Sequence, residues 1–96
     1  MTEFVVLTTP RFDRLARSLR KTHRAEFTAQ FEEALAVLRA DPYNRGSRHP
    51  IKKLSGVKPG EGQYRIRLRR FRFRYDIIRR DVVLHSCALR REDTYR

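Results

Sequence analysis

The densest chemical pattern in the sequence is a set of arginines that alternate with apolar residues. Residues 64–75 read YRIRLRRFRFRY, so that Arg65, Arg67, Arg72 and Arg74 each follow an aromatic or aliphatic residue. Alternation with a period of two is typical of strands that bury one face. Because guanidinium groups bind phosphate through paired N–H donors, a pair of such strands would present a phosphate-binding surface.

A tight turn in the middle of this segment would place the arginines on one face of a hairpin. If Arg69 and Arg70 form a two-residue loop, the apolar residues meet across the hairpin on the face that packs on the helices. On the other face, the predicted pairs are Arg65 with Arg74 and Arg67 with Arg72. Like charges opposite one another destabilise a sheet, which favours a bound anion over a merely solvated face. Arg-Arg is, however, an unfavourable pair for a tight turn.

Two further side chains in the sequence could move a proton near these arginines. A second tight loop at 79–80 would pair Arg74 with His85 and put Asp76 on the same face. His85 could then transfer a proton or stack on a base, although a strand histidine without chemistry is the alternative. Tyr95 follows the last strand and could fold over the arginines, where cations favour its phenolate form and proton acceptance from a ribose 2′-hydroxyl.

The overall charge points to the same class of ligand. The 96 residues include 23 Lys and Arg against 11 Asp and Glu, a net charge of +12, and most of this excess lies in the second half of the chain. A clustered excess of this kind predicts one cationic face and a polyanionic partner, with RNA favoured. General basicity that serves solubility is the alternative.

Other classes of site find little support in the sequence. Cys87 is the only cysteine, so neither an internal disulfide nor a thiolate metal site is expected, and its place in a strand favours the core over a nucleophilic role. His23, His49 and His85 are scattered, and no phosphate-binding glycine loop occurs, so no metal and no cofactor are expected. The chain has no apolar leader or membrane-length run, which predicts a cytoplasmic protein without membrane contact.

The elements that must position these residues follow from the apolar pattern. Residues 4–7 predict a strand, Thr9-Pro10 a helix start, and residues 24–39 a second helix that ends before Pro42. The first helix should end near residues 21–23, and residues 42–62 should form a loop. The predicted order is β-α-α-β-β-β, an α+β fold in which a mostly antiparallel sheet packs on an N-terminal αα-hairpin, within a single domain over residues 1–96.

Several short motifs, taken together, resemble the RelE/ParE toxin superfamily. They are IKKLSG at 51–56, GQYRIRL at 62–68, FRFRY at 71–75 and REDTY at 91–95, in the order and with the spacing of that family. The resemblance implies the toxin of a type II toxin–antitoxin pair. Its RelE-like branch, which we favour, cuts mRNA in the ribosome without a metal, through attack of the ribose 2′-hydroxyl on the adjacent phosphate. The ParE-like branch, the alternative, inhibits DNA gyrase, and a non-catalytic RNA-binding domain is a further alternative.

The resemblance also implies roles for individual residues. Arg65 and Arg67 stand at lysine positions of RelE-like toxins, and Arg72 at an arginine that stabilises the transition state. Arg90 or Arg91 stands at a proposed general acid, and Tyr95 at a stacking or proton-accepting tyrosine. The remaining residues expected to bind RNA are Lys52, Lys53, Arg69, Arg70, Arg74 and His85.

The departures from the family pattern leave the proton acceptor open. Arginine does not deprotonate in proteins, so Arg65 and Arg67 cannot act as bases. Tyr95, His85, or one of the lysines at 52 and 53 would have to take the proton. The implied partners are a cognate antitoxin, mRNA and the ribosome with its rRNA, and the toxin–antitoxin complex is expected to be oligomeric.

Overall fold

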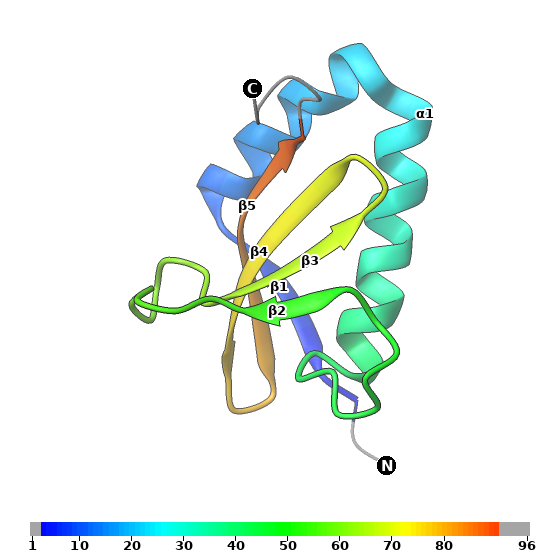
Figure 1. Cartoon of the computed structure of the whole chain (residues 1–96). Helices are drawn as coiled ribbons and strands as arrows, with labels where there is room; N and C mark the ends of the chain where they lie inside the picture. The colour runs from blue at the N-terminus through cyan, green and yellow to red at the C-terminus, as the bar shows by residue number, and fades with distance from the viewer. Residues whose placement is uncertain (1–2, 91–96) are drawn as a thin grey trace.

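A computed structural model describes residues 3–90, which form a five-stranded sheet and one long helix (Figure 1). The elements are β1 (Val5–Thr8), α1 (Pro10–Ala40), β2 (Ile51–Lys53), β3 (Tyr64–Leu68), β4 (Phe71–Ile78) and β5 (Asp81–Leu89). The strand order is β1-β5-β4-β3-β2, in which only the β1–β5 pair is parallel. The α+β class is therefore confirmed, with a mixed sheet that is larger than the sequence predicted.

The predicted αα-hairpin is wrong, because one helix of 31 residues replaces it. Thr9 caps α1 with its hydroxyl, which accepts a hydrogen bond from the Phe12 amide at 3.1 Å. His23 alone has non-helical torsion angles (φ −136°, ψ 46°), and the two arms of α1 meet there at an angle (Figure 1). Residues 20–25 contain neither glycine nor proline to end the first arm, so the chain bends without forming a loop.

The core lies between α1 and one face of the sheet. The rings of Phe12 and Phe27 from α1 lie 5.5–6.4 Å from those of Phe71 and Phe73 on β4. Tyr75 is fully buried beside them, and its hydroxyl donates to the Pro42 carbonyl at 2.7 Å. Burial raises the pKa of Tyr75 far above its ordinary value, so it remains a neutral structural donor.

The predicted β3–β4 register is confirmed. Leu68 pairs with Phe71, Arg67 with Arg72, and Arg65 with Arg74. The loop of this hairpin is Arg69-Arg70, and the β4–β5 loop is Arg79-Arg80, as predicted. The first arginine of each loop has a positive φ, +54° at Arg69 and +57° at Arg79. Both turns therefore keep two residues at the cost of a left-handed backbone conformation.

Two features of the sheet differ from the prediction. Ile51–Lys53 form an edge strand antiparallel to β3 inside the segment that was predicted as loop. A strand of three residues with two exposed lysines has too short an apolar pattern to be distinguished from a loop. A bulge shifts the β4–β5 register between Arg74 and Tyr75, so that Arg74 pairs with Ser86 and the predicted pairing with His85 is wrong.

Within residues 3–90, no helix combines the length and the apolar character that a membrane span requires.

Candidate nucleic-acid interface

Three of the predicted arginines gather on the sheet face opposite the core. Arg65, Arg72 and Arg74 line a hollow of about 410 Å³, which we call the arginine groove. Arg11, from the first turn of α1, completes its cationic lining, and Leu54, Ser86 and Ala88 are among its other residues. Several guanidinium groups around one hollow form a cationic surface that suits an anion such as a phosphate.

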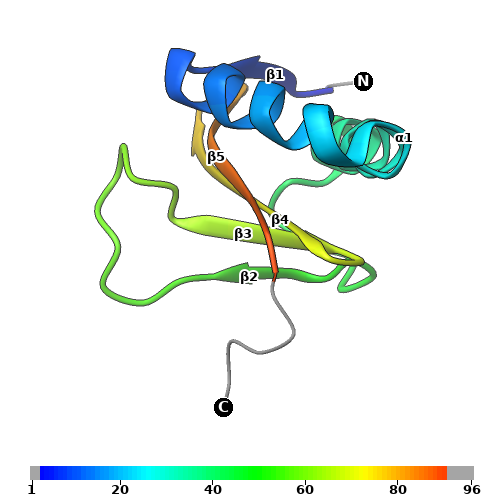
Figure 2. The ribbon, with the colours of Figure 1, turned by 90° about the horizontal axis from the view of Figure 1, so that it is seen from above.

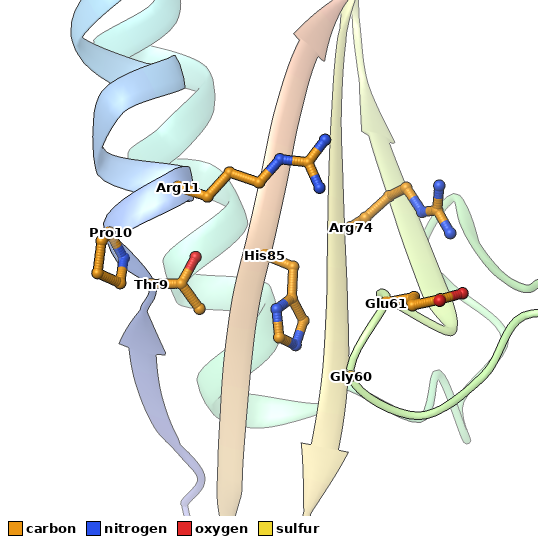
Figure 3. Close-up of a pocket in the computed structure, with 7 residues that line it drawn as sticks. All are labelled: Thr9, Pro10, Arg11, Gly60, Glu61, Arg74 and His85. Atoms are coloured by element: carbon orange, nitrogen blue, oxygen red, sulfur yellow. The ribbon is translucent and has the colours of Figure 1, made fainter.

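A second hollow, of about 460 Å³, adjoins the arginine groove. Thr9, Arg11, Glu61, Arg74 and His85 are among its lining residues, and we call it the histidine pocket. Arg11 and Arg74 line both hollows, which therefore adjoin at these two side chains, and we refer to the two hollows together as the depression. Figure 3 shows that Arg11 from α1 and Arg74 from β4 extend to the same side of the sheet as His85 on β5.

Arg74 is held in place by the loop that precedes β3. Its Nε and Nη2 donate to the Gly62 carbonyl oxygen at 3.1 and 3.0 Å. Gly62 is buried with a φ of +85°, and a β-carbon at this position would lie 2.9 Å from the β-carbon of Arg74. Only glycine combines this backbone conformation with such a close approach, so the position of Arg74 depends on Gly62.

Asp76 anchors the same loop from beneath and is only 3% exposed. Its carboxylate accepts backbone N–H groups from Gly60 at 2.8 Å, Gly62 at 3.1 Å and Gln63 at 2.8 Å. Burial alone would raise the pKa of Asp76, but these donors and His85 outweigh it and lower the pKa below its ordinary value. Asp76 therefore remains a carboxylate, and a rigidly held one.

His85 is oriented by this carboxylate. Its Nε2 lies 2.8 Å from Oδ2 of Asp76, and its side chain is 20% exposed. Because of the bulge, His85 pairs with no residue of β4 in the ladder, and Ser86 lies opposite Arg74. Because Nε2 is engaged with Asp76, Nδ1 of a neutral imidazole is left as the nitrogen that can accept a proton.

Other predicted residues lie apart from this depression. Arg67 and Arg69 line a separate hollow beside Pro50 and the second arm of α1. Arg70 donates to both carboxylate oxygens of Glu26 on α1, at 2.7 and 3.0 Å, and this hydrogen-bonded ion pair lowers the pKa of Glu26. The structure therefore unites three of the four strand arginines, and it ties Arg70 to the helix.

The remaining predicted site residues are two lysines on β2 and the residues at and after the end of β5. Lys52 is exposed and lies opposite Arg65 in the β2–β3 ladder, whereas the Lys53 ammonium lies 5.7 Å from the centre of the Tyr64 ring. Arg90 follows β5, and its backbone N–H donates to the Arg70 carbonyl at 2.6 Å. Arg91 and Tyr95 lie outside the described residues.

Sequence reasoning missed Arg11 and Glu61. Arg11 reaches the depression because the parallel β1–β5 pairing brings the start of α1 beside β5, and no spacing in the sequence connects it to Arg74. The glycines at 60 and 62 were the available signal for the loop, since closely spaced glycines before a strand often mark a close backbone approach. Asp76 was expected on this face, but its role as the anchor of the loop was not.

Cys87 belongs to the hydrophobic core, as predicted, although it also borders the arginine groove. Burial raises its pKa to about 12, so it remains a thiol. In the described part of the chain, no group of three His, Cys, Asp or Glu residues is placed to hold a metal ion. Comparison of the chain with protein-family models, curated proteins and solved structures finds no match.

Proposed function

We propose that this protein is an endoribonuclease that acts as the toxin of a toxin–antitoxin pair, in the manner of the RelE-like branch it resembles. The observation that carries the proposal is the arginine groove, in which Arg65, Arg72 and Arg74 from two strands and Arg11 from α1 line one hollow. A groove of this composition suits a phosphodiester, and the net charge of +12 favours a polyanion over a small anion.

The proposed reaction is attack of a ribose 2′-hydroxyl on the adjacent phosphorus of mRNA, which releases the 5′-oxygen of the next nucleotide. Negative charge accumulates on the phosphoryl oxygens in the transition state. Guanidinium groups already in place would stabilise this charge without rearrangement. Arg72 and Arg74 suit this role, because they lie on the central strand β4, where the sheet holds their backbone on both sides.

The ribosome is the proposed setting of this reaction, and the cytoplasm the proposed compartment. A strongly cationic protein is drawn to rRNA by the field of the phosphates, and this attraction weakens as salt concentration rises. Exposed arginines away from the groove, such as Arg69, would contribute to binding rRNA without touching the cleaved phosphate.

An antitoxin is the proposed protein partner, within an oligomeric complex. Val5, Leu7 and Ile78 are large apolar side chains that are exposed, and Val5 and Ile78 share Asp81 as a strand neighbour. An antitoxin segment with acidic and apolar residues could cover this patch and neutralise the groove at once. Folding of such a segment upon binding is common among disordered regulators.

The test is to induce the protein in bacterial cells and to map mRNA ends by primer extension, for the wild type, Arg72→Ala and Arg17→Ala. Arg17 is exposed on α1 and does not line the arginine groove, so Arg17→Ala removes the same charge elsewhere. We expect growth arrest and new mRNA ends for the wild type and Arg17→Ala, and loss of both for Arg72→Ala with the fold retained.

Other outcomes would contradict the proposal in distinct ways. Growth arrest with DNA breaks and intact mRNA would indicate gyrase inhibition. RNA binding that weakens with salt, without any cleavage, would indicate a non-catalytic RNA-binding domain.

A further inference from the structure

The histidine pocket contains a pair of side chains that is built for proton transfer. Asp76 is fixed by backbone N–H groups from three loop residues, at 2.8 to 3.1 Å, and its Oδ2 lies 2.8 Å from Nε2 of His85. A carboxylate held this firmly fixes both the position and the tautomer of the imidazole. In a neutral imidazole, this contact would place the proton on Nε2 and leave the lone pair of Nδ1 for a substrate.

The pocket also holds the groups that would place a phosphate near this imidazole. Arg11 and Arg74 line it together with His85 (Figure 3), and Arg74 is fixed by two hydrogen bonds to the Gly62 carbonyl. Glu61 also lines the pocket, and its carboxylate repels an anion. A phosphate is therefore expected beside the two arginines, where the histidine pocket adjoins the arginine groove.

We propose that His85, positioned by Asp76, is the general base that takes the proton of the attacking 2′-hydroxyl, while Arg11 and Arg74 hold the scissile phosphate. This inference rests on the proposed ribonuclease function. It assigns the proton acceptor to β5, and not to the C-terminal Tyr95 that the resemblance implies. His85, Arg11 and Arg74 would contact the RNA, whereas Asp76 acts through His85 as a positioning residue.

The proposed step balances without a further cofactor. The 2′-hydroxyl proton passes to Nδ1 of His85 as the 2′-oxygen bonds to phosphorus and the bond from phosphorus to the 5′-oxygen breaks. A water molecule donates a proton to the departing 5′-oxygen, and the resulting hydroxide takes the proton from His85. The products are a 2′,3′-cyclic phosphate and a 5′-hydroxyl, and the imidazole returns to its neutral form.

The experiment compares His85→Gln with His49→Gln in cleavage of a short mRNA bound to ribosomes, across a range of pH. Glutamine retains an N–H donor that can reach Asp76, and His49 lies in the segment before β2, outside both hollows. Affinity is measured separately with the same RNA carrying a 2′-deoxy group at the cut site. We expect kcat to fall about 100- to 10,000-fold in His85→Gln, the usual contribution of a general base.

The shape of the pH profile separates catalysis from a structural role. Wild type and His49→Gln should lose activity towards acidic pH, because a protonated imidazole cannot act as a base, and His85→Gln should lack this acidic limb. Asp76, Arg74, Arg11 and Glu61 are the other charged groups that face His85 or its pocket, and they remain unchanged in this variant. Affinity for the 2′-deoxy RNA should stay within about threefold of wild type, since a base contributes to the transition state alone.

The inference is overturned if His85→Gln cleaves at the wild-type rate, or keeps the acidic limb. Wild-type protein that cleaves no RNA would instead overturn the proposed function, and the assignment of His85 with it. If His85→Gln does not fold, nitrogen NMR of the wild type decides. The Nδ1 resonance of His85 should then shift on addition of an RNA that ends at the cut site in a 3′-phosphate, which keeps the 2′-hydroxyl and lacks the leaving group, while that of His49 does not. An unchanged His85 resonance would refute the assignment.

Discussion

At the scale of single residues, Gly62 connects the charged side chains of the candidate site. Its carbonyl accepts from Arg74, its N–H donates to Asp76, and Asp76 in turn contacts His85. A side chain at this position would be strained by the positive φ, and its β-carbon would also lie 2.9 Å from the β-carbon of Arg74. Gly56 has a similar φ of +72° with nothing within 4 Å of the added β-carbon, so it isolates the effect of the backbone alone.

Gly62→Ala should therefore destabilise the protein more than Gly56→Ala. We expect a loss of about 1 kcal/mol in unfolding free energy for Gly56→Ala from the left-handed backbone, and of about 2–4 kcal/mol for Gly62→Ala, which adds the clash. Urea denaturation measures both. Equal losses would mean that the contact with Arg74 does not constrain the loop.

The carboxylate of Asp76 predicts a dependence of stability on pH. Because the folded-state pKa of Asp76 lies below its ordinary value, its contribution is complete above the unfolded-state pKa of about 4 and is lost as pH falls through the folded-state value. Asp76→Asn should be less stable than wild type at neutral pH, where the amide cannot accept all four donors. The difference should shrink below about pH 4, as measured by urea unfolding at several pH values.

Asp41 provides the matched control for this measurement. Burial alone would raise its pKa, but the backbone N–H groups of Arg45 and Gly46 outweigh burial and lower it. Asp41 follows α1 and lines neither the histidine pocket nor the arginine groove. Asp41→Asn should show the same trend in stability while RNA cleavage stays at the wild-type level. If the difference in unfolding free energy between wild type and Asp76→Asn stayed constant down to about pH 2, Asp76 would not be a carboxylate stabilised by these donors.

At the scale of elements, the sequence predicted the strands and turns that follow from alternation with a period of two. The pairing of β3 with β4, the burial of Phe71, Phe73 and Tyr75, and both Arg-Arg turns are confirmed. The parts that could not be predicted depend on tertiary contacts. They are the kink that joins two helical patterns at His23, the short edge strand β2, and the bulge that frees His85.

The residues of the candidate site also fall into those that strand alternation predicts and those that depend on tertiary contacts. Arg65, Arg72 and Arg74 followed from strand alternation, because the sheet face alone decides where they lie. Arg67 also lies on this hairpin but lines a different hollow, which Pro50 and the second arm of α1 help to form. Strand alternation alone could not predict this. Arg11 comes from the start of α1, a position that only the sheet topology reveals; Figure 2 shows α1 crossing above the sheet.

The two hairpin turns make a prediction about stability. Arg79 has a φ of +57°, a conformation that asparagine adopts more readily than arginine, while Arg80 is not in this region. Arg79→Asn should raise the free energy of unfolding by about 0.5–1 kcal/mol, and Arg80→Asn should not raise it. Thermal and urea unfolding of both variants would check this, and an increase for Arg80→Asn alone would refute the turn geometry.

At the scale of the whole molecule, the protein separates an apolar face of the sheet, covered by α1, from a cationic face. The arginine groove lies on the cationic face. The exposed Val5 and Leu7 lie on the edge strand β1, and the exposed Ile78 lies at the end of β4. Such a division suits a protein that contacts RNA with one region and is silenced by a protein partner that covers more than one.

The groove predicts a specific salt dependence of RNA binding. Removal of one phosphate contact from a single strand should reduce the slope of log affinity against log salt by about 0.7. Arg65→Ala should show this reduction with single-stranded RNA, whereas Arg17→Ala, which has the same net charge, should not. Equal slopes for the two variants in a fluorescence-anisotropy titration would show that RNA does not bind in the groove.

The central claim is that the 2′-hydroxyl at the cut site attacks the adjacent phosphate, and two mRNAs that differ only in this hydroxyl test it most directly. Translating ribosomes carrying either an all-ribose mRNA or the same mRNA with a single 2′-deoxy nucleotide at the cut site are incubated with the wild-type protein. We predict that the first is cut to a 2′,3′-cyclic phosphate and a 5′-hydroxyl, and that the second remains intact at this site. Cleavage of both mRNAs, or of neither, would contradict the account.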